Sequence, residues 1–150
     1  MAQRVGHVNT GLILQEMPEV NQANADIEKL QADLLANGEK MVMEFQAEYE
    51  AVVAEKQSGN LTPVQEQQKQ ESLQQKQAKI QAYQQEVQAE LIKKREELYR
   101  PILDRLDKVI ADMGKEGDFL FIFDTAVPNV ILFAEEPLDL TDEVRKRLGD

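Results

Sequence analysis

The stretch SGNLTPVQ, residues 58–65, separates two long helical patterns and decides how the chain folds. Gly59 is a residue type that commonly ends helices. Thr62 suits the N-cap of a new helix, Pro63 suits its first position, and Gln65 lies three residues after the cap, as in a capping box. We therefore predict that one helix ends here, that a second begins at once, and that the two run antiparallel.

The second helix begins with a glutamine-rich tract, QEQQKQESLQQKQAKIQAYQQEVQ, at residues 65–88. Such a composition favours disorder, because it offers little apolar surface to bury. Leu73, Ile80 and Val87, however, are seven residues apart, and Tyr83 and Leu91 share their face of a helix. The tract contains no glycine or proline. We predict a long, mostly solvated helix with a narrow apolar seam.

If the hairpin folds between residues 60 and 61, the register of its two helices is fixed. Residues that face each other then have numbers that add up to about 121. The apolar pairs predicted in this way are Leu30 with Leu91, Leu34 with Val87, and Met41 with Ile80. Gly38 is predicted to face Tyr83. A glycine costs on the order of 1 kcal/mol in a helix interior. Either the tyrosine ring needs the space, or the glycine is simply tolerated.

The chain ends predict short strands at residues 4–9, 119–124 and 130–134, a short helix before Pro18, and a last helix from Thr141. The ends must meet for these strands to pair. We predict an α+β fold in which residues 1–17 and 102–150 form a small β-sheet body. Residues 18–101 form a long antiparallel helical hairpin, a coiled-coil-like arm with its tip near residues 58–62. From Pro18 or Pro101 to the tip is about 40 residues, or roughly 60 Å.

The outer half of this arm carries more apolar side chains on its first helix than the glutamine-rich helix can cover. Either they face a third element, or they form an exposed apolar patch of the kind that marks interaction. Methionine and aromatic side chains suit adaptable contacts. The predicted interaction residues are Val42, Met43, Phe45, Tyr49, Val52 and Val53.

The strands of the body are apolar on both faces, and open edges of such strands are prone to aggregation. Pooling strands from several subunits into a closed barrel removes both problems, so we expect an obligate oligomer. The predicted barrel residues are Val5, Val8, Phe119, Phe121, Phe123, Val130, Ile131, Leu132 and Phe133.

No catalytic, cofactor or metal site is predicted, and we do not expect an enzyme. There is no cysteine and no glycine-rich phosphate loop, and no metal set with suitable spacing. A structural role is expected for the single histidine, His7. Acidic residues with simple explanations as turns, helix caps or solvated faces are Asp104, Asp107, Asp124, Asp139 and Asp142.

The net charge of −11 argues against a nucleic-acid partner. No apolar run approaches the roughly 20 residues needed to span a membrane, and the start lacks a signal-peptide pattern. From the residues alone, a cytosolic chain and a mature secreted chain are both open.

Sequence blocks at both ends of the chain are distinctive. They are VGHVNTGLILQEMPE near the start and, near the end, YRPILDRLDKVIADMGKEGDFLFIFDTA and VILFAEEPLDLTDEV, with the Gln/Glu/Lys-rich hairpin between them. With these blocks, the chain resembles the Skp/OmpH-like family of periplasmic chaperones over essentially its whole length. The terminal blocks are the specific part, because many coiled coils would match the hairpin.

The resemblance implies a homotrimer with a central β-barrel and three helical arms around a cavity. That cavity would hold unfolded outer-membrane β-barrel proteins without ATP, with the apolar arm residues as the client-binding surface. The resemblance also implies the periplasm of a Gram-negative cell, with a signal peptide removed from the chain, and no stable membrane insertion.

The charge of the arm departs from the best-known relatives, which are basic. Here the first helix is acidic, and Lys93, Lys94 and Arg95 form the only basic cluster of the arm. A lipopolysaccharide site is therefore not carried over, and attraction of acidic clients is in doubt. The competing hypothesis is a structural coiled-coil scaffold with one fixed protein partner. A prefoldin-like chaperone is disfavoured, because its strands lie between its helices.

Overall fold

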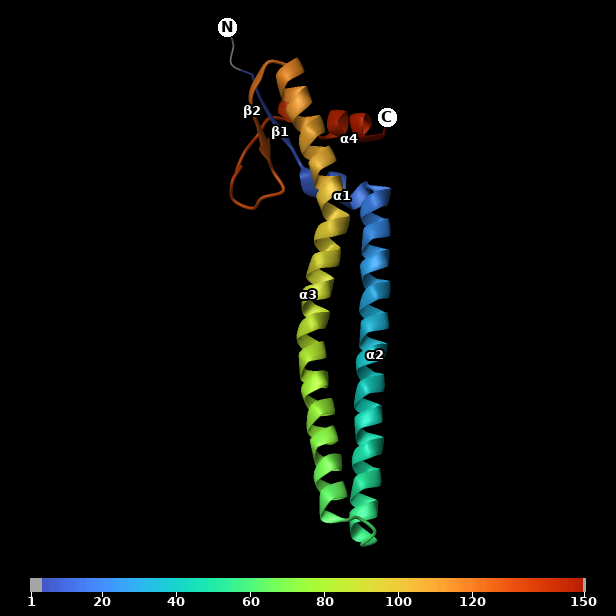
Figure 1. Ribbon diagram of the computed structural model, residues 1–150. Coiled ribbons are helices and arrows are strands. Elements are labelled where there is room, and N and C mark those ends of the chain that lie inside the picture. Colours follow the sequence, from blue (N-terminus) through green and yellow to red (C-terminus); the bar gives the residue numbers. More distant parts are fainter. Residues whose placement is uncertain (1–3, 150) are drawn as a thin grey trace. The chain divides into compact units, whose positions relative to one another are not determined.

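The computed structural model describes residues 4–149, which form long helices and a small sheet (Figure 1). The elements in chain order are β1 (Arg4–Val8), α1 (Thr10–Glu16), α2 (Pro18–Gln57), α3 (Pro63–Glu116), β2 (Phe119–Asp124), a 3-10 turn η1 (Glu136–Leu138) and α4 (Thr141–Gly149). They belong to two compact units. One unit contains both chain ends, Met1–Ala25 and Arg95–Asp150, and the other is the hairpin Asp26–Lys94.

The tip of the hairpin has the predicted helix-stop and helix-start geometry. Gly59 has a positive φ of 71°, which glycine adopts without strain, and its N–H donates to the Lys56 carbonyl at 3.2 Å. The Gln65 N–H donates to Thr62 Oγ1 at 3.3 Å, and the Thr62 N–H donates to Gln65 Oε1 at 3.0 Å. This reciprocal pair is a capping box, so the predicted start of the second helix is confirmed.

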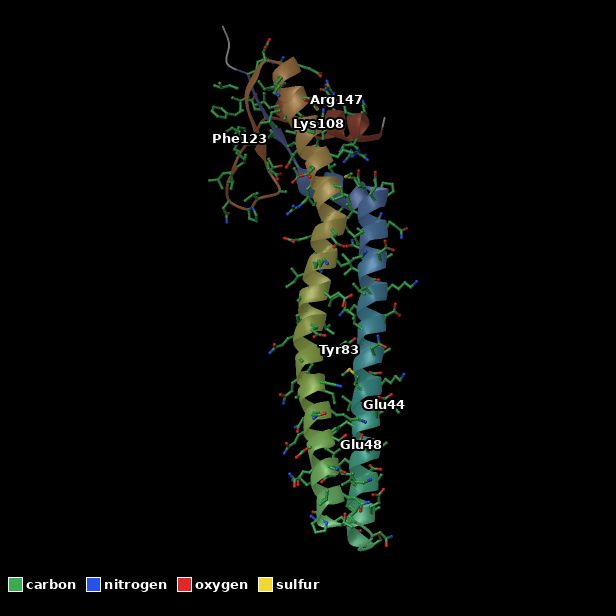
Figure 2. All side chains as sticks on the ribbon, in the orientation of Figure 1. Glu44, Glu48, Tyr83, Lys108, Phe123 and Arg147 are labelled. Atoms are coloured by element: carbon green, nitrogen blue, oxygen red, sulfur yellow. The ribbon has the colours of Figure 1, made fainter. Side chains whose placement is uncertain are left out.

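The inner half of the hairpin is held by an apolar seam centred on Tyr83, whose side chain is labelled in Figure 2. The Tyr83 hydroxyl donates to the Leu34 carbonyl at 2.9 Å, and Leu34 is buried. A Cβ added to Gly38 would lie 3.4 Å from the Tyr83 ring. The predicted pairing of Gly38 with Tyr83 is confirmed, and the ring is the packing neighbour of the glycine.

The outer half of the hairpin is joined mainly by charged side chains, as expected where the return helix is so polar. Glu48 accepts a hydrogen bond from Ser72 Oγ at 2.8 Å as well as forming an ion pair. The ion pairs across the two helices are Glu48 with Lys76, Glu55 with Lys69, and Lys56 with Glu66. All lie within one helical turn of the predicted register.

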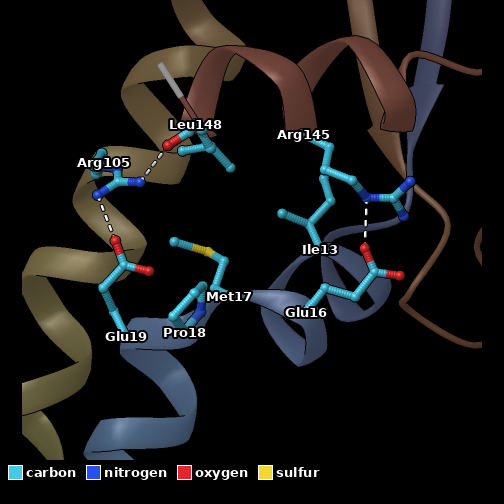
Figure 3. Close-up of a pocket in the computed structure, with 9 residues that line it drawn as sticks. Ile13, Glu16, Met17, Pro18, Glu19, Arg105, Arg145 and Leu148 are labelled. Atoms are coloured by element: carbon cyan, nitrogen blue, oxygen red, sulfur yellow. Dashed lines mark hydrogen bonds and ion pairs between the residues drawn. The ribbon is translucent and has the colours of Figure 1, made fainter.

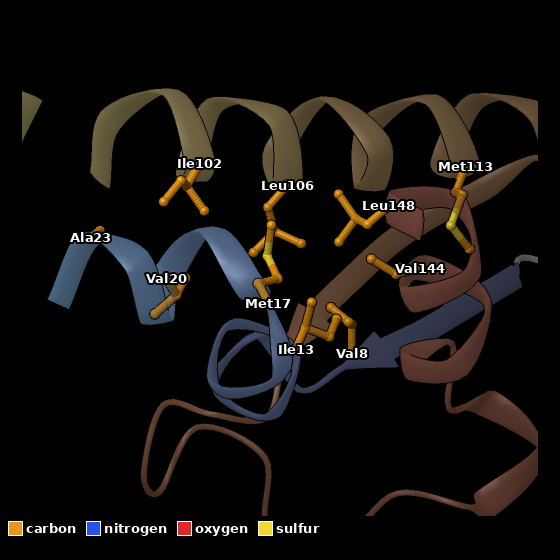
Figure 4. Close-up of a cluster of buried hydrophobic side chains, with 10 residues drawn as sticks. All are labelled: Val8, Ile13, Met17, Val20, Ala23, Ile102, Leu106, Met113, Val144 and Leu148. Atoms are coloured by element: carbon orange, nitrogen blue, oxygen red, sulfur yellow. The ribbon is translucent and has the colours of Figure 1, made fainter. Parts of the chain in front are cut away.

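The unit of the chain ends has a conventional apolar core, shown in Figure 4. Residues 102, 106 and 113 lie on one face of α3, and residues 144 and 148 lie on one face of α4, so each helix presents an apolar stripe. The buried residues of this cluster are Val8, Ile13, Met17, Val20, Ala23, Ile102, Leu106, Met113, Val144 and Leu148. The sequence predicts the end of α3 near Met113, but the helix continues through Gly114 to Glu116.

The sheet pairs the two chain ends, as predicted. β1 and β2 run parallel, with Val5 opposite Phe121 and His7 opposite Phe123. A Cβ on Gly6 would lie only 2.6 Å from the Leu140 side chain, so glycine lets the segment before α4 approach β1 closely. The α+β fold with a long helical hairpin and a small sheet from both chain ends is therefore confirmed.

The predicted third strand at residues 130–134 is wrong, because this segment is irregular in the structure. A strand needs a neighbour with free backbone groups. Both edges of β1 are engaged, one by β2 and the other by residues 139 and 140, where the Leu140 N–H donates to the His7 carbonyl at 2.8 Å, and residues 130–134 do not pair with the remaining edge of β2. Leu132 and Phe133 are consequently left 87% and 83% exposed.

Candidate functional site

Apolar side chains are exposed along one face of α2 within the hairpin. Leu35, Val42 and Tyr49 are seven residues apart and therefore lie on nearly the same face of the helix. All three are exposed, Leu35 by 63% and Tyr49 by 53%. We call these three residues the α2 stripe. The Tyr49 ring stacks on Phe45 with centroids 6.4 Å apart, which places the half-buried Phe45 between the stripe and the seam.

The six interaction residues predicted from the sequence divide into two groups. Val42, Met43 and Tyr49 are exposed, and Met43 is the most exposed of them at 70%. Phe45, Val52 and Val53 are half-buried. Positions 45 and 52 continue the spacing of Leu34, which is buried in the seam. Their burial therefore places them nearer the second helix than the stripe.

Leu35 is absent from the sequence-based set, although a signal for it exists. It lies seven residues before Val42 and fourteen before Tyr49, so helical periodicity alone places the three side chains together. Its neighbour Leu34 is buried in the seam, and adjacent residues face different sides of a helix. The exposed stripe is longer, and begins nearer the inner half of the hairpin, than the predicted set implies.

Some charged groups near the stripe already form ion pairs within the hairpin. The pKa of Glu48 is held below its ordinary value of 4.5, first by the hydrogen bond from Lys76 and then by that from Ser72. Glu48 is thus engaged in holding α2 to α3. Lys40 pairs with Glu44 along α2 at 3.9 Å.

A second group of apolar side chains lies on the outer face of β2. Phe121 and Phe123 point away from the core, with ring centroids 5.8 Å apart; Phe123 is labelled in Figure 2. Phe119 is half-buried, and the Arg4 guanidinium lies 4.4 Å from its ring centroid. A cleft of about 330 Å³ adjoins the strand, lined in part by Phe119, Phe121 and Gly114.

The remaining predicted barrel residues differ in exposure. Val130, Leu132 and Phe133 are exposed in the irregular segment, and Val5 and Ile131 are half-buried. Val8, by contrast, is only 2% exposed and belongs to the core of the single chain.

A pocket of about 420 Å³ lies between α1, the start of α2, α3 and α4 (Figure 3). Its charged groups are already paired. Arg105 donates to Glu19 at 2.7 Å and to the Leu148 carbonyl at 2.6 Å, and Arg145 Nε lies 2.6 Å from a Glu16 carboxylate oxygen. These contacts hold the C-terminal end of α4 against the helices below it, which is a structural role.

The titratable residues near the chain ends also have structural roles. His7 Nε2 lies 3.4 Å from the Glu135 carbonyl, and His7 Nδ1 lies 3.9 Å from an Asp139 oxygen. Asp139 accepts the Thr141 N–H at 2.9 Å, which confirms its predicted capping of α4. Burial raises the pKa of Asp139, but the two hydrogen bonds from Thr141 outweigh burial and leave that pKa below its ordinary value of 3.8. His7 therefore lies beside a helix cap.

Asp124 closes the turn after β2, as predicted. Its carboxylate accepts the Ala126 N–H at 2.9 Å and the Thr10 hydroxyl at 2.5 Å. Over residues 4–149, no group of three or more His, Asp or Glu side chains is placed to hold a metal ion.

None of the helices in the described part of the chain has the length and apolarity needed to cross a membrane.

Comparison with known proteins assigns the family. The family described as "Outer membrane protein (OmpH-like)" matches residues 4–148, so the chain belongs to the OmpH-like (Skp) family. An uncharacterized protein of Aquifex aeolicus (strain VF5) is 26% identical over 141 residues, covering 94% of this chain and 83% of that protein. The fold is shared with a proposed outer-membrane chaperone (OmpH-like) from Caulobacter crescentus CB15, at a TM-score of 0.81 and 16% identity. That match covers 99% of this chain and 85% of the other.

Proposed function

We propose that this OmpH-like protein is an ATP-independent holdase, which binds unfolded outer-membrane proteins and prevents their aggregation. The observation that carries the proposal is the α2 stripe, an exposed row of apolar side chains on a hairpin that has too few apolar partners to cover it. Exposed apolar surface of this kind is kept in soluble proteins when it is used for binding. No nucleotide-binding motif is present in the sequence, which agrees with a passive mechanism.

The holdase would work as a homotrimer in which clients lie in a cavity between the hairpin arms. Support for assembly comes from the outer face of β2, where Phe121 and Phe123 are exposed, and from the irregular segment with Leu132 and Phe133. Covering such side chains with the same region of another subunit removes them from water and closes the open edge of β2. We place the protein in the periplasm, where outer-membrane proteins pass in unfolded form.

The proposal is tested by diluting an unfolded outer-membrane β-barrel protein out of denaturant with increasing amounts of this protein and no nucleotide. Light scattering should fall, and suppression should be complete at less than one trimer per client chain. Sedimentation should give a trimer. No suppression at any ratio would contradict the holdase.

A structural scaffold with one fixed partner is the second candidate. The spacing of seven residues between Leu35, Val42 and Tyr49 favours it, because such a row suits packing against one further helix. A scaffold would yield one folded, stoichiometric partner when captured from its own cell, whereas a holdase would yield many unfolded ones.

A further inference from the structure

Three glutamates follow one line along α2; Glu39 lies directly beside the α2 stripe, whereas Glu50 is turned about 100° from its neighbour Tyr49. Glu28, Glu39 and Glu50 are eleven residues apart, which is about three helical turns, so they form a line along the helix. Glu39 lies between two stripe residues, four positions after Leu35 and three before Val42. All three glutamates are exposed. We call Glu28, Glu39 and Glu50 the acidic rim.

The acidic rim is not neutralised by the surrounding residues. In the described part of the chain, Glu28 and Glu39 form no ion pair, and Glu50 accepts only the Gln46 amide at 3.3 Å. Lys29 and Lys40 follow Glu28 and Glu39 in sequence, but adjacent residues are turned about 100° from each other around a helix. Lys40 and Lys56 are moreover paired with Glu44 and Glu66.

The net charge of α2 within the hairpin is negative. Residues 26–57 contain eight acidic and three basic side chains, which gives a net charge of −5 on this part of α2. A partner that lies on the apolar stripe must place its own charged groups within a few ångströms of the rim. At that separation, opposite charges attract and like charges repel, and the interaction weakens with salt.

From this arrangement we infer that the stripe selects cationic apolar segments, in which aliphatic or aromatic side chains are interspersed with lysine or arginine. The inference rests on the proposed function, since it assumes that the stripe binds unfolded chains. The stripe from Leu35 to Tyr49 spans about 21 Å, which corresponds to six or seven residues of extended chain. One or two cations in a segment of that length suffice to reach the rim.

The test uses three fluorescent peptides of the same length with identical apolar residues. The first carries lysines between them, the second carries glutamates at the same positions, and the third carries serines. Fluorescence anisotropy with the full-length protein should give the order lysine, then serine, then glutamate, with about tenfold between the extremes at low salt. The difference should shrink strongly in 0.5 M salt, where the screening length is a few ångströms.

A matched pair of variants locates the effect on the rim. Glu39→Gln with Glu50→Gln should weaken binding of the lysine peptide about threefold and leave the serine peptide unchanged. Asp33→Asn with Glu86→Gln removes the same charge from exposed hairpin positions outside the rim that form no ion pair in the described residues, and should change lysine-peptide binding much less. Circular dichroism confirms that both variants keep their helices.

Each outcome discriminates. Equal binding of all three peptides, tighter binding of the glutamate peptide, or equal weakening by both variant pairs overturns the inference, while suppression of client aggregation still supports the holdase. If no peptide binds and no client is held, the proposed function itself fails. If clients are held and no peptide binds, the rim does not select them and the inference is overturned alone.

Discussion

Leu106 and Leu35 both lie on long helices of the same chain, yet the first is 2% exposed and the second 63% exposed. Leu106 belongs to the unit of the chain ends, where side chains from five elements meet in one cluster. Leu35 belongs to the hairpin, where a single partner helix covers only one face of α2. A two-helix unit cannot surround a side chain, so some apolar residues must stay in water or bind something else.

The two units consequently obtain their stability in different ways. Burial of apolar area stabilises the unit of the chain ends, and this term is large and insensitive to salt. The outer half of the hairpin instead uses ion pairs between exposed side chains, such as Glu55 with Lys69 at 2.6 Å, each of which contributes little. Low local stability in the hairpin is compatible with a binding role, because the binding surface itself adds nothing to the fold.

The largest contrast is expected from truncating the two leucines. Leu106→Ala should lower the free energy of unfolding by about 2–5 kcal/mol, because it opens a cavity in a packed core. Leu35→Ala should change it by about 0.5 kcal/mol or less. Urea unfolding at a fixed protein concentration measures both. Similar losses would mean that Leu35 is buried in the assembled protein and that the stripe is part of the core.

The second-largest loss of stability is expected from removing a buried hydrogen bond in the unit of the chain ends. Thr141 Oγ1 accepts the Asn9 N–H at 3.0 Å and donates to Asp139 at 2.5 Å, and the residue is buried. Thr141→Val leaves the Asn9 donor without a partner and should cost about 1–3 kcal/mol. Thr141→Ser keeps the hydroxyl and should retain most of this stability. Equal losses for both variants would mean that the hydroxyl of Thr141 stabilises the fold no more than its methyl group does.

The hairpin seam should show a smaller effect. Tyr83→Phe removes the hydrogen bond to the Leu34 carbonyl and should cost about 0.5–1.5 kcal/mol. Tyr49→Phe is the matched control, because Tyr49 is exposed and forms no hydrogen bond through its hydroxyl in the described residues. Hydrogen exchange of the hairpin amides measures both changes locally. A larger effect of Tyr49→Phe would indicate that the stripe is engaged within the free protein.

Acid should produce the smallest effect, confined to the outer hairpin. The pKa of Glu48 is lowered in the folded chain, chiefly by Lys76, so protonation favours the unfolded hairpin. The stability that ionised Glu48 adds to the hairpin is complete above its unfolded pKa of about 4.5. That stability is lost as the pH falls through the lower pKa of the folded chain. Between pH 6 and pH 3, Glu48→Gln should therefore lose less stability than the parent chain. High salt should reduce this difference in stability loss between the parent chain and Glu48→Gln. A difference that salt leaves unchanged would argue against the ion pair.

Local signals in the sequence were sufficient for the helices and the tip. The capping box at Thr62 and Gln65 involves residues three apart, so its geometry follows from the helix itself. Once the turn is located, antiparallel packing leaves little freedom in register, which is why Gly38 and Tyr83 could be paired in advance. Helix periodicity also predicts Leu35 in the stripe, because it lies seven residues before Val42.

Contacts between residues far apart in the sequence could not be predicted from local patterns. An apolar segment at residues 130–134 satisfies the local criteria for a strand, but in the folded chain it does not pair with the open edge of β2 and stays irregular. Nor did any pattern indicate that Arg105 would bind the Leu148 carbonyl and Glu19 together, since these contacts join residues far apart in sequence.

The sequence by itself determined the helical hairpin, its turn, its seam and the excess of apolar residues on α2, because each depends on the periodicity and capping of one or two helices. Only the tertiary structure decided which apolar residues are buried. Val8 lies in the core and Phe121 outside it, although both are apolar strand residues. Burial depends on what covers a residue from the rest of the chain, and that is set by packing among elements distant in sequence.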